Sequence, residues 1–263
     1  MVFAQPLPVA LSPSRLSDFQ SCPRRYQHAS VDRIPQPASY ASTKGRYVHA
    51  ILELLFALDA AQRTRERASA LRDEAEATVL TDEVRADLEL DATMLERLRA
   101  ESEEILDVYF VMEDPRHVHP EGVELRLNVE VAGTPLLGIL DRLDRDDEGN
   151  LVIVDYKTGS VPDRRYDSLT FANTELYAAL CESHFGERPA AIRLLYVAKG
   201  TTMERRVSDV VVRARVQSAQ QAWSRITTYY DDGDFPATPS ARACRFCAYQ
   251  ERCRAAGVPV VIR

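Results

Sequence analysis

Residues 136–157, LLGILDRLDRDDEGNLVIVDYK, contain two stretches of strand-forming residues separated by a polar turn. The first stretch, 136–145, and the second, 151–157, are rich in Leu, Ile and Val. The residues between them, 146–150, are acidic or small and are typical of a tight connection. The pattern predicts an antiparallel hairpin.

Three side chains of this hairpin carry possible chemistry. Side chains two apart in a strand point to the same face, so Asp155 and Lys157 project together and Tyr156 points away. If Asp141 faces the same side, two carboxylates converge in a way that suits a hard divalent cation such as Mg²⁺. Lys157 would add a positive charge able to orient water or stabilise charge on a phosphate. An isolated Asp-x-Lys is more often a solvated surface pattern, so this interpretation depends on other features of the chain.

Gly138, the acid three residues after it, the hairpin and the run Asp155-Tyr156-Lys157-Thr158-Gly159 together resemble the nuclease motif of the PD-(D/E)XK superfamily, in its RecB-like branch. The resemblance implies an α/β fold with a restriction-endonuclease-like core, in which helices flank a central mixed sheet. It implies metal ligation by His49, Asp141, Asp155 and the carbonyl of Tyr156, with Lys157 positioning the attacking water.

Two upstream residues match the same family pattern. His49 lies among apolar residues at helical spacing, Val48, Ile51 and Leu52, which predicts an amphipathic helix. Glu124 lies on a strictly alternating stretch, 123–131, where the resemblance places an acid on the first core strand. A solvated strand glutamate remains an equally open interpretation of Glu124.

A helix after the hairpin matches the family in part. The family carries Gln-x-x-x-Tyr here, and this chain has Asn173 and Tyr177. A spacing of four places both residues on one helix face. The resemblance gives both a role in holding the active site and substrate, although the shorter amide of Asn173 leaves its contact in doubt.

Four of the five cysteines form a candidate metal site. Cys244, Cys247 and Cys253 make a C-x₂-C-x₅-C run within the segment 236–263, and Cys22 lies near the other end. Clustered cysteines in a reducing compartment usually bind metal, and four thiolates suit either zinc or a [4Fe-4S] cluster. The arrangement resembles the iron-sulfur staple of AddB-type nucleases, which implies the cluster. The remaining cysteine, Cys181, is expected to be a buried core residue.

Length and charge are compatible with one nuclease domain spanning 1–263. The chain has 263 residues, 45% of them hydrophobic, and a net charge of −7. Residues 59–114 hold 17 acids against 7 arginines, a net of −10, and read as a helical insertion of two or three amphipathic helices. The rest of the chain is therefore +3. We expect a cytoplasmic protein, because no membrane-spanning run or signal peptide is evident.

Basic residues gather near the cysteines at both ends of the chain. These are Arg15, Arg24, Arg25, Arg33, Lys44 and Arg46 at one end and Arg242, Arg245, Arg252 and Arg254 at the other. Such a patch could follow a phosphate backbone. The aromatic residues available for base stacking there are Phe19, Tyr26, Tyr40, Phe246 and Tyr249.

The sequence therefore predicts a Mg²⁺- or Mn²⁺-dependent DNA exonuclease with a [4Fe-4S] cluster, acting on single-stranded ends in repair or recombination. Two alternatives stay open. One is a catalytically inactive DNA-binding scaffold with the cluster that partners a helicase. The other is a zinc-stapled protein whose hairpin acids are incidental. No ATP-binding Gly-x-x-x-x-Gly-Lys motif occurs, so any unwinding would come from a partner.

Overall fold

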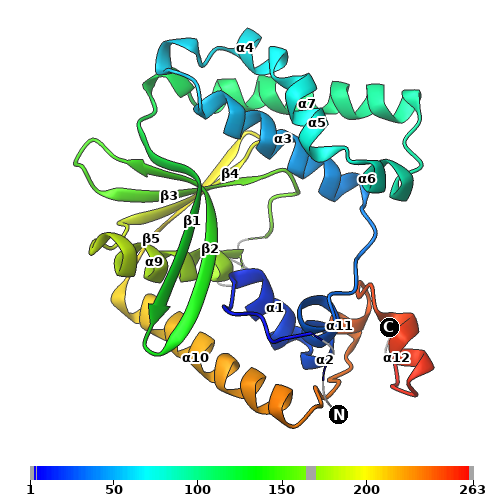
Figure 1. The fold of residues 1–263 in the computed structure, drawn as a ribbon. Helices are drawn as coiled ribbons and strands as arrows, with labels where there is room; N and C mark the ends of the chain where they lie inside the picture. Colours follow the sequence, from blue (N-terminus) through cyan, green and yellow to red (C-terminus); the bar gives the residue numbers. More distant parts are fainter. Residues whose placement is uncertain (1–2, 4, 164–169, 261–263) are drawn as a thin grey trace.

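A five-stranded mixed sheet forms the centre of the molecule (Figure 1). The computed structural model describes residues 3, 5–163 and 170–260, so parts of the predicted segments 1–263 and 236–263 lie outside the described residues. The strands follow one another in sequence order and are β1 Pro120–Val131, β2 Thr134–Arg145, β3 Leu151–Lys157, β4 Ala191–Tyr196 and β5 Thr201–Arg206. All neighbours are antiparallel except β3 and β4, which are parallel.

The predicted hairpin is confirmed. Residues 142–145 of β2 pair with 151–154 of β3, and the two strands separate beyond Arg142 and Val154. Two further strands, β4 and β5, complete the sheet. The chain thus has the mixed sheet flanked by helices that the resemblance implies.

Helices cover both faces of the sheet. They are α1 Pro13–Ser21, α2 Pro23–Tyr26, a π-helical turn Gln27–Val31, α3 Tyr40–Phe56, α9 Ala172–Phe185, α10 Asp209–Asp231, α11 Ala241–Cys244 and α12 Gln250–Ala255. One apolar core lies between the sheet and α1, α9 and α10, and includes Leu140 and Ile153. A second core lies on the opposite face against α3, α5 (Arg72–Val79) and α7 (Ala92–Met112), and includes Val154 and Tyr156. Because successive side chains of β3 point to opposite faces of the sheet, this strand contributes residues to both cores.

The acidic insertion is more divided than expected. Within 59–114 lie the 3₁₀ turn Ala60–Gln62 and the helices α4 Arg65–Ala70, α5 Arg72–Val79, α6 Asp82–Asp87 and α7 Ala92–Met112, and a second 3₁₀ turn, Pro115–His117, follows. Side chains of Thr64, Thr81 and Asp91 accept hydrogen bonds from backbone N–H groups three residues later and so begin new helices. These caps explain why four α-helices replace the two or three that periodicity predicted.

The two ends of the chain lie side by side, with α11 next to α2 (Figure 1). Arg24 forms an ion pair with Asp234 at 2.9 Å, and the hydroxyl of Tyr249 donates to the carbonyl of Ile34 at 3.1 Å. The amide of Thr238 approaches Cys22 Sγ at 3.4 Å. In the described parts of the chain, no helix is long and apolar enough to span a bilayer.

Candidate metal centre

The centre begins where β2 and β3 separate. Beyond the last paired residues, the carboxylate of Asp141 takes the place of a strand partner and accepts a hydrogen bond from the amide of Tyr156 at 2.8 Å. This bond fixes Asp141 in the gap between the strands. The side chain is 17% exposed, so its other oxygen remains open to a ligand.

His49 reaches the same gap from α3. Its Nε2 lies 3.1 Å from the carbonyl oxygen of Tyr156, and its Nδ1 lies 3.6 Å from Asp141 Oδ2. A carbonyl can only accept, so Nε2 carries a proton, and Nδ1 faces the carboxylate of Asp141. A backbone contact of this kind is how proteins orient metal-binding imidazoles. The carbonyl oxygen of Tyr156, which was predicted to be a metal ligand, is hydrogen-bonded to His49 here.

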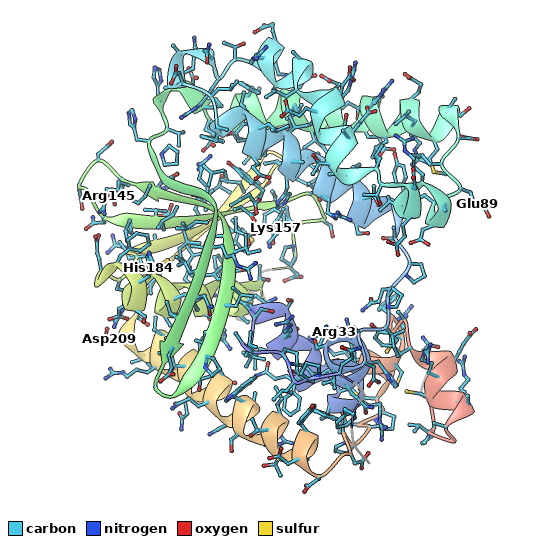
Figure 2. All side chains as sticks on the ribbon, in the orientation of Figure 1. Arg33, Glu89, Arg145, Lys157, His184 and Asp209 are labelled. Atoms are coloured by element: carbon cyan, nitrogen blue, oxygen red, sulfur yellow. The ribbon has the colours of Figure 1, made fainter. Side chains whose placement is uncertain are left out.

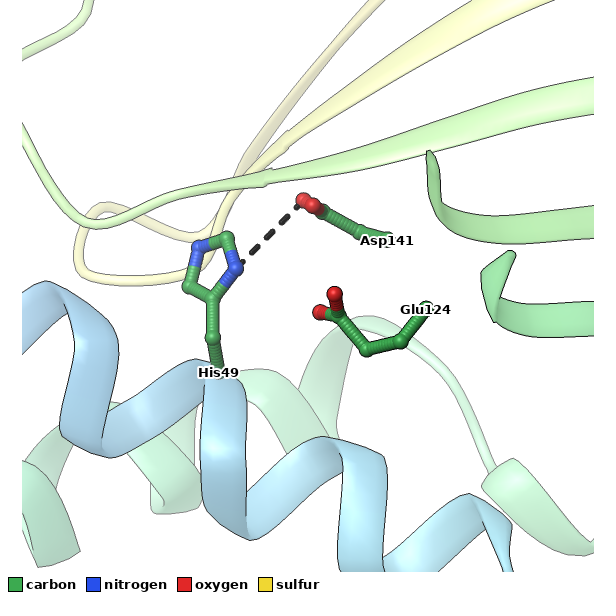
Figure 3. A group of neighbouring side chains, drawn as sticks. All are labelled: His49, Glu124 and Asp141. Atoms are coloured by element: carbon green, nitrogen blue, oxygen red, sulfur yellow. Dashed lines mark ion pairs between the residues drawn. The ribbon is translucent and has the colours of Figure 1, made fainter. Parts of the chain in front are cut away.

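Glu124 completes the group from β1. It lies between the strand pairs Val123–Arg142 and Leu125–Leu140, and therefore across from Asp141. Its backbone φ of 45° is left-handed, which interrupts the regular strand at this residue. One ligand atom each from His49, Glu124 and Asp141 lie within 4.8 Å of one another (Figure 3).

The electrostatics of this group fit a divalent cation. Burial, together with repulsion from Asp141 and Glu53, raises the pKa of Glu124 to about 7. Burial and the charge of Asp155 raise the pKa of Asp141 to about 6, although His49 and the Tyr156 amide act in the opposite direction. Two carboxylates this close to each other repel when both are ionised, and a bound cation would relieve that repulsion. Two carboxylates with one imidazole form a donor set for a divalent metal, so the residues fit the ion that the sequence predicted.

Asp155 and Lys157 form a separate pair at the end of β3 (Figure 2 labels Lys157). Lys157 Nζ lies 2.5 Å from Asp155 Oδ2, so the carboxylate is bound to the ammonium group and is not part of the compact trio. Burial alone would lower the pKa of Lys157, but Asp155 and Asp141 outweigh it and raise the pKa. The lysine is therefore held as a cation beside the metal centre.

Helix α9 packs against the hairpin at Gly138. A Cβ at this position would lie 2.7 Å from both Tyr177 Cε1 and Leu180 Cδ2, which explains why glycine occupies it. Burial raises the pKa of Tyr177, and the charges of Asp155, Asp141 and Glu124 add to the effect, so its hydroxyl stays protonated. Asn173 is exposed one turn earlier and lines a cleft with Gln20 and Arg242.

An open cleft of about 540 Å³ leads to the trio. It is bounded by Arg46 and Glu53 of α3, by Ile139 of β2, and by Thr78 and Val79 of α5. One helix of the acidic insertion thus forms part of the wall of this cleft.

The family of this chain can now be stated. A family model described as the PD-(D/E)XK nuclease superfamily matches residues 10–254. The chain belongs to this superfamily. Its sheet, its hairpin and the acids on that hairpin are therefore parts of a nuclease-superfamily core.

Comparison with solved structures agrees at the level of the fold. A structure described as "Putative exonuclease" from Eubacterium rectale has a TM-score of 0.56 and 14% identity, over 96% of this chain and 91% of that chain. A second structure, named SSO0001, has a TM-score of 0.37 and 15% identity, over 78% of this chain and 84% of that chain, and carries no argument. No curated protein matches the chain.

The sequence interpretation missed one buried charged residue of the sheet, Arg142 on β2. Arg142 is fully buried, and its guanidinium contacts Glu113 at 2.5 Å, Asp144 at 2.8 Å and the hydroxyl of Tyr156 at 2.6 Å. It ties the end of α7 to β2 and β3, on the face of the sheet that α3 covers. The available signal was a pair of charges, Arg142 and Asp144, two apart on a strand side that is otherwise buried.

The four predicted cluster cysteines share one cavity but do not form a compact site. Cys22, Cys244, Cys247 and Cys253 all line it. Burial raises the pKa of the Cys253 thiol, and nearby Cys247, Cys22 and Cys244 contribute. Among the described His, Cys, Asp and Glu residues, His49, Glu124 and Asp141 are the one group of three or more whose ligand atoms lie within 4.8 Å of one another. No three of the four thiols therefore lie that close together. Cys181 is fully buried in the core, as expected.

Proposed function

We propose that this chain is a metal-dependent DNA exonuclease of the RecB-like branch. The observation that carries the proposal is the convergence of His49, Glu124 and Asp141 beside the Asp155–Lys157 pair. Membership of the nuclease superfamily supports phosphodiester hydrolysis as the reaction. Action on single-stranded ends, a place in cytoplasmic DNA repair or recombination, and cooperation with a helicase belong to the same proposal and rest on the resemblance.

Each residue of the centre has a defined part in this proposal. His49, Glu124 and Asp141 would hold Mg²⁺ or Mn²⁺. Asp155 would act as a further ligand. The cation would supply Lewis-acid stabilisation of charge on a phosphate oxygen. The Lys157 ammonium provides a second positive charge, able to orient water or to stabilise charge that develops on the phosphate. The protonated hydroxyl of Tyr177 can donate a hydrogen bond at the same place.

We further propose that Cys22, Cys244, Cys247 and Cys253 hold a [4Fe-4S] cluster with a structural role. The proposal rests on the resemblance and is supported by the cavity that the four thiols share. The preference for the cluster over a zinc ion rests on the resemblance, because four thiolates suit either group.

A cleavage assay on end-labelled single-stranded DNA tests the function. With Mg²⁺ or Mn²⁺ we expect mononucleotides or short products, and with EDTA no cleavage. Substrates blocked at the 5′ end, blocked at the 3′ end, or circular separate the two polarities from endonuclease action. Absence of metal-dependent cleavage on every substrate would instead favour the inactive DNA-binding scaffold.

A further inference from the structure

Phe246 is the one aromatic residue among the large hydrophobic side chains that stand exposed in the described parts of the chain. It is 82% exposed, whereas Phe19, Tyr26 and Tyr249 are all buried. Tyr40 is half-buried, so Phe246 is the most exposed of the five aromatic residues near the basic patch.

The position of Phe246 is fixed by its neighbours. Cys244 and Cys247, which precede and follow Phe246 in the sequence, line the cysteine cavity. Phe246 is not one of the described residues that line this cavity. Gln250 Nε2 donates to the carbonyl of Cys244 at 2.7 Å, and Tyr249 is anchored through its hydroxyl to Ile34. The ring thus projects from a segment whose other side chains are held in place.

The charge around Phe246 selects an anionic partner. The described part of the segment from 236 onward has four arginines, Arg242, Arg245, Arg252 and Arg254, against a single acid, Glu251. All four are exposed. The guanidinium of Arg245 lies 5.3 Å from the centre of the Phe246 ring. An exposed aromatic ring in a segment rich in arginines is suited to single-stranded nucleic acid, which such sites bind by base stacking and phosphate contact.

A cleft lies between this segment and helix α9. Arg242 and Asn173 line the same cleft of about 540 Å³. Asn173 begins the turn of α9 that leads to Tyr177, and Tyr177 lies within the field of Asp155, Asp141 and Glu124. Arg242 and the helix that carries Tyr177 therefore border one cleft.

We propose that Phe246, Arg245 and Arg242 form a binding site for single-stranded DNA, in which a base stacks on the Phe246 ring and the two arginines contact the adjacent phosphates. This inference rests on the proposed nuclease function, because it assigns part of the substrate path to that site. It gives the cysteine-rich segment a direct role in substrate binding in addition to any structural one.

Fluorescence anisotropy with labelled oligo(dT) in EDTA, where cleavage is blocked, tests the site in protein purified anaerobically with its cofactor. Phe246→Ala should weaken binding roughly 5- to 150-fold, the range for loss of one base–aromatic stack. Phe246→Tyr should restore binding and Phe246→Leu should not, because stacking needs a ring. Val210→Ala, an equally simple truncation of a side chain 72% exposed on α10, is the control and should leave binding unchanged.

Salt dependence tests the arginines. If each contacts one phosphate, the double substitution Arg242→Ala and Arg245→Ala should reduce the slope of log K against log salt by about 1.4. Wild-type affinity in Phe246→Ala, or equal rescue by Leu and Tyr, overturns the site. Wild-type protein that binds oligo(dT) through Phe246 but never cleaves it contradicts the nuclease function and leaves the site standing. Wild-type protein that cleaves while Phe246→Ala binds normally contradicts the site alone.

Discussion

Glu124 has a left-handed backbone conformation, which residues other than glycine rarely adopt. This residue is part of the candidate metal centre. Such a conformation costs about 1–3 kcal/mol and persists where the surroundings enforce it. Alternation along 123–131 could predict which face Glu124 occupies, but it could not reveal the irregular backbone that brings the carboxylate to Asp141. His49, Asp141, Asp155 and Lys157 could be proposed from the sequence because motif spacing is local, whereas which acids meet depends on how three elements pack.

If Glu124 is a metal ligand, Glu124→Gln should weaken Mn²⁺ binding at least tenfold, because one of two anionic ligands is lost. Isothermal titration with Mn²⁺ measures this directly. Glu130→Gln, an exposed glutamate on the same strand, is the matched control and should bind Mn²⁺ as the wild type does. Equal affinities in the two variants would remove Glu124 from the metal site.

At the scale of elements, the contact between β2 and α9 is set by Gly138. Gly138→Ala should destabilise the protein by about 1–3 kcal/mol, because the added methyl group would overlap Tyr177 and Leu180. It should also lower nuclease activity, since Tyr177 must move. Gly159→Ala is the control, because no atom lies within 4 Å of a Cβ there. Thermal and urea unfolding of both variants measure the difference, and an unchanged Gly138→Ala protein would disprove the tight contact.

The link between α7 and the sheet depends on Glu113 and Arg142. Burial alone would raise the pKa of Glu113, but hydrogen bonds and charge from Arg142 outweigh it and lower the pKa. A lowered pKa means that this pair stabilises the fold above the unfolded value near 4.5 and that the stabilisation is lost as pH falls through the lower folded-state value.

Glu113→Gln should therefore cost about 3 kcal/mol at pH 7, because Arg142 would keep its charge while losing a charged partner. Below pH 4.5 the difference from the wild type should shrink. Glu104→Gln, an exposed residue of the same helix, should unfold as the wild type does at every pH. A Glu113→Gln deficit that stays constant from pH 7 to pH 3 would contradict the ion-pair account. The sequence of the hairpin predicted the strands in this region. It could not predict this ion pair, because Glu113, the partner of Arg142, lies outside the hairpin.

At the scale of the whole molecule, the two chain ends meet around the cysteine cavity. The sequence predicted this meeting from the separation of Cys22 from the other three cysteines. It could not predict the distances between the thiols, because these depend on loop conformation and on the bound group.

Cys22→Ser should remove the proposed cluster and lower the thermal midpoint of the entire domain, since the staple joins its first and last segments. Iron, sulfide and zinc analysis of anaerobically purified protein measures the loss. Cys181→Ala, which changes a buried thiol outside the cavity, should keep its iron. Wild-type protein that contains zinc and no iron would contradict the cluster.

The central claim is that the trio on α3, β1 and β2 is a catalytic metal centre. Asp141→Asn tests it most directly, because the amide oxygen can still accept from the Tyr156 N–H while the charge is lost. The measurement is Mn²⁺-dependent cleavage of end-labelled single-stranded DNA, with Asp147→Asn, an exposed residue of the same hairpin, as the control. We predict cleavage by the wild type and by Asp147→Asn, and a loss of at least 100-fold, about 3 kcal/mol, in Asp141→Asn with unchanged folding in EDTA. Equal cleavage by Asp141→Asn and the wild type would contradict the account.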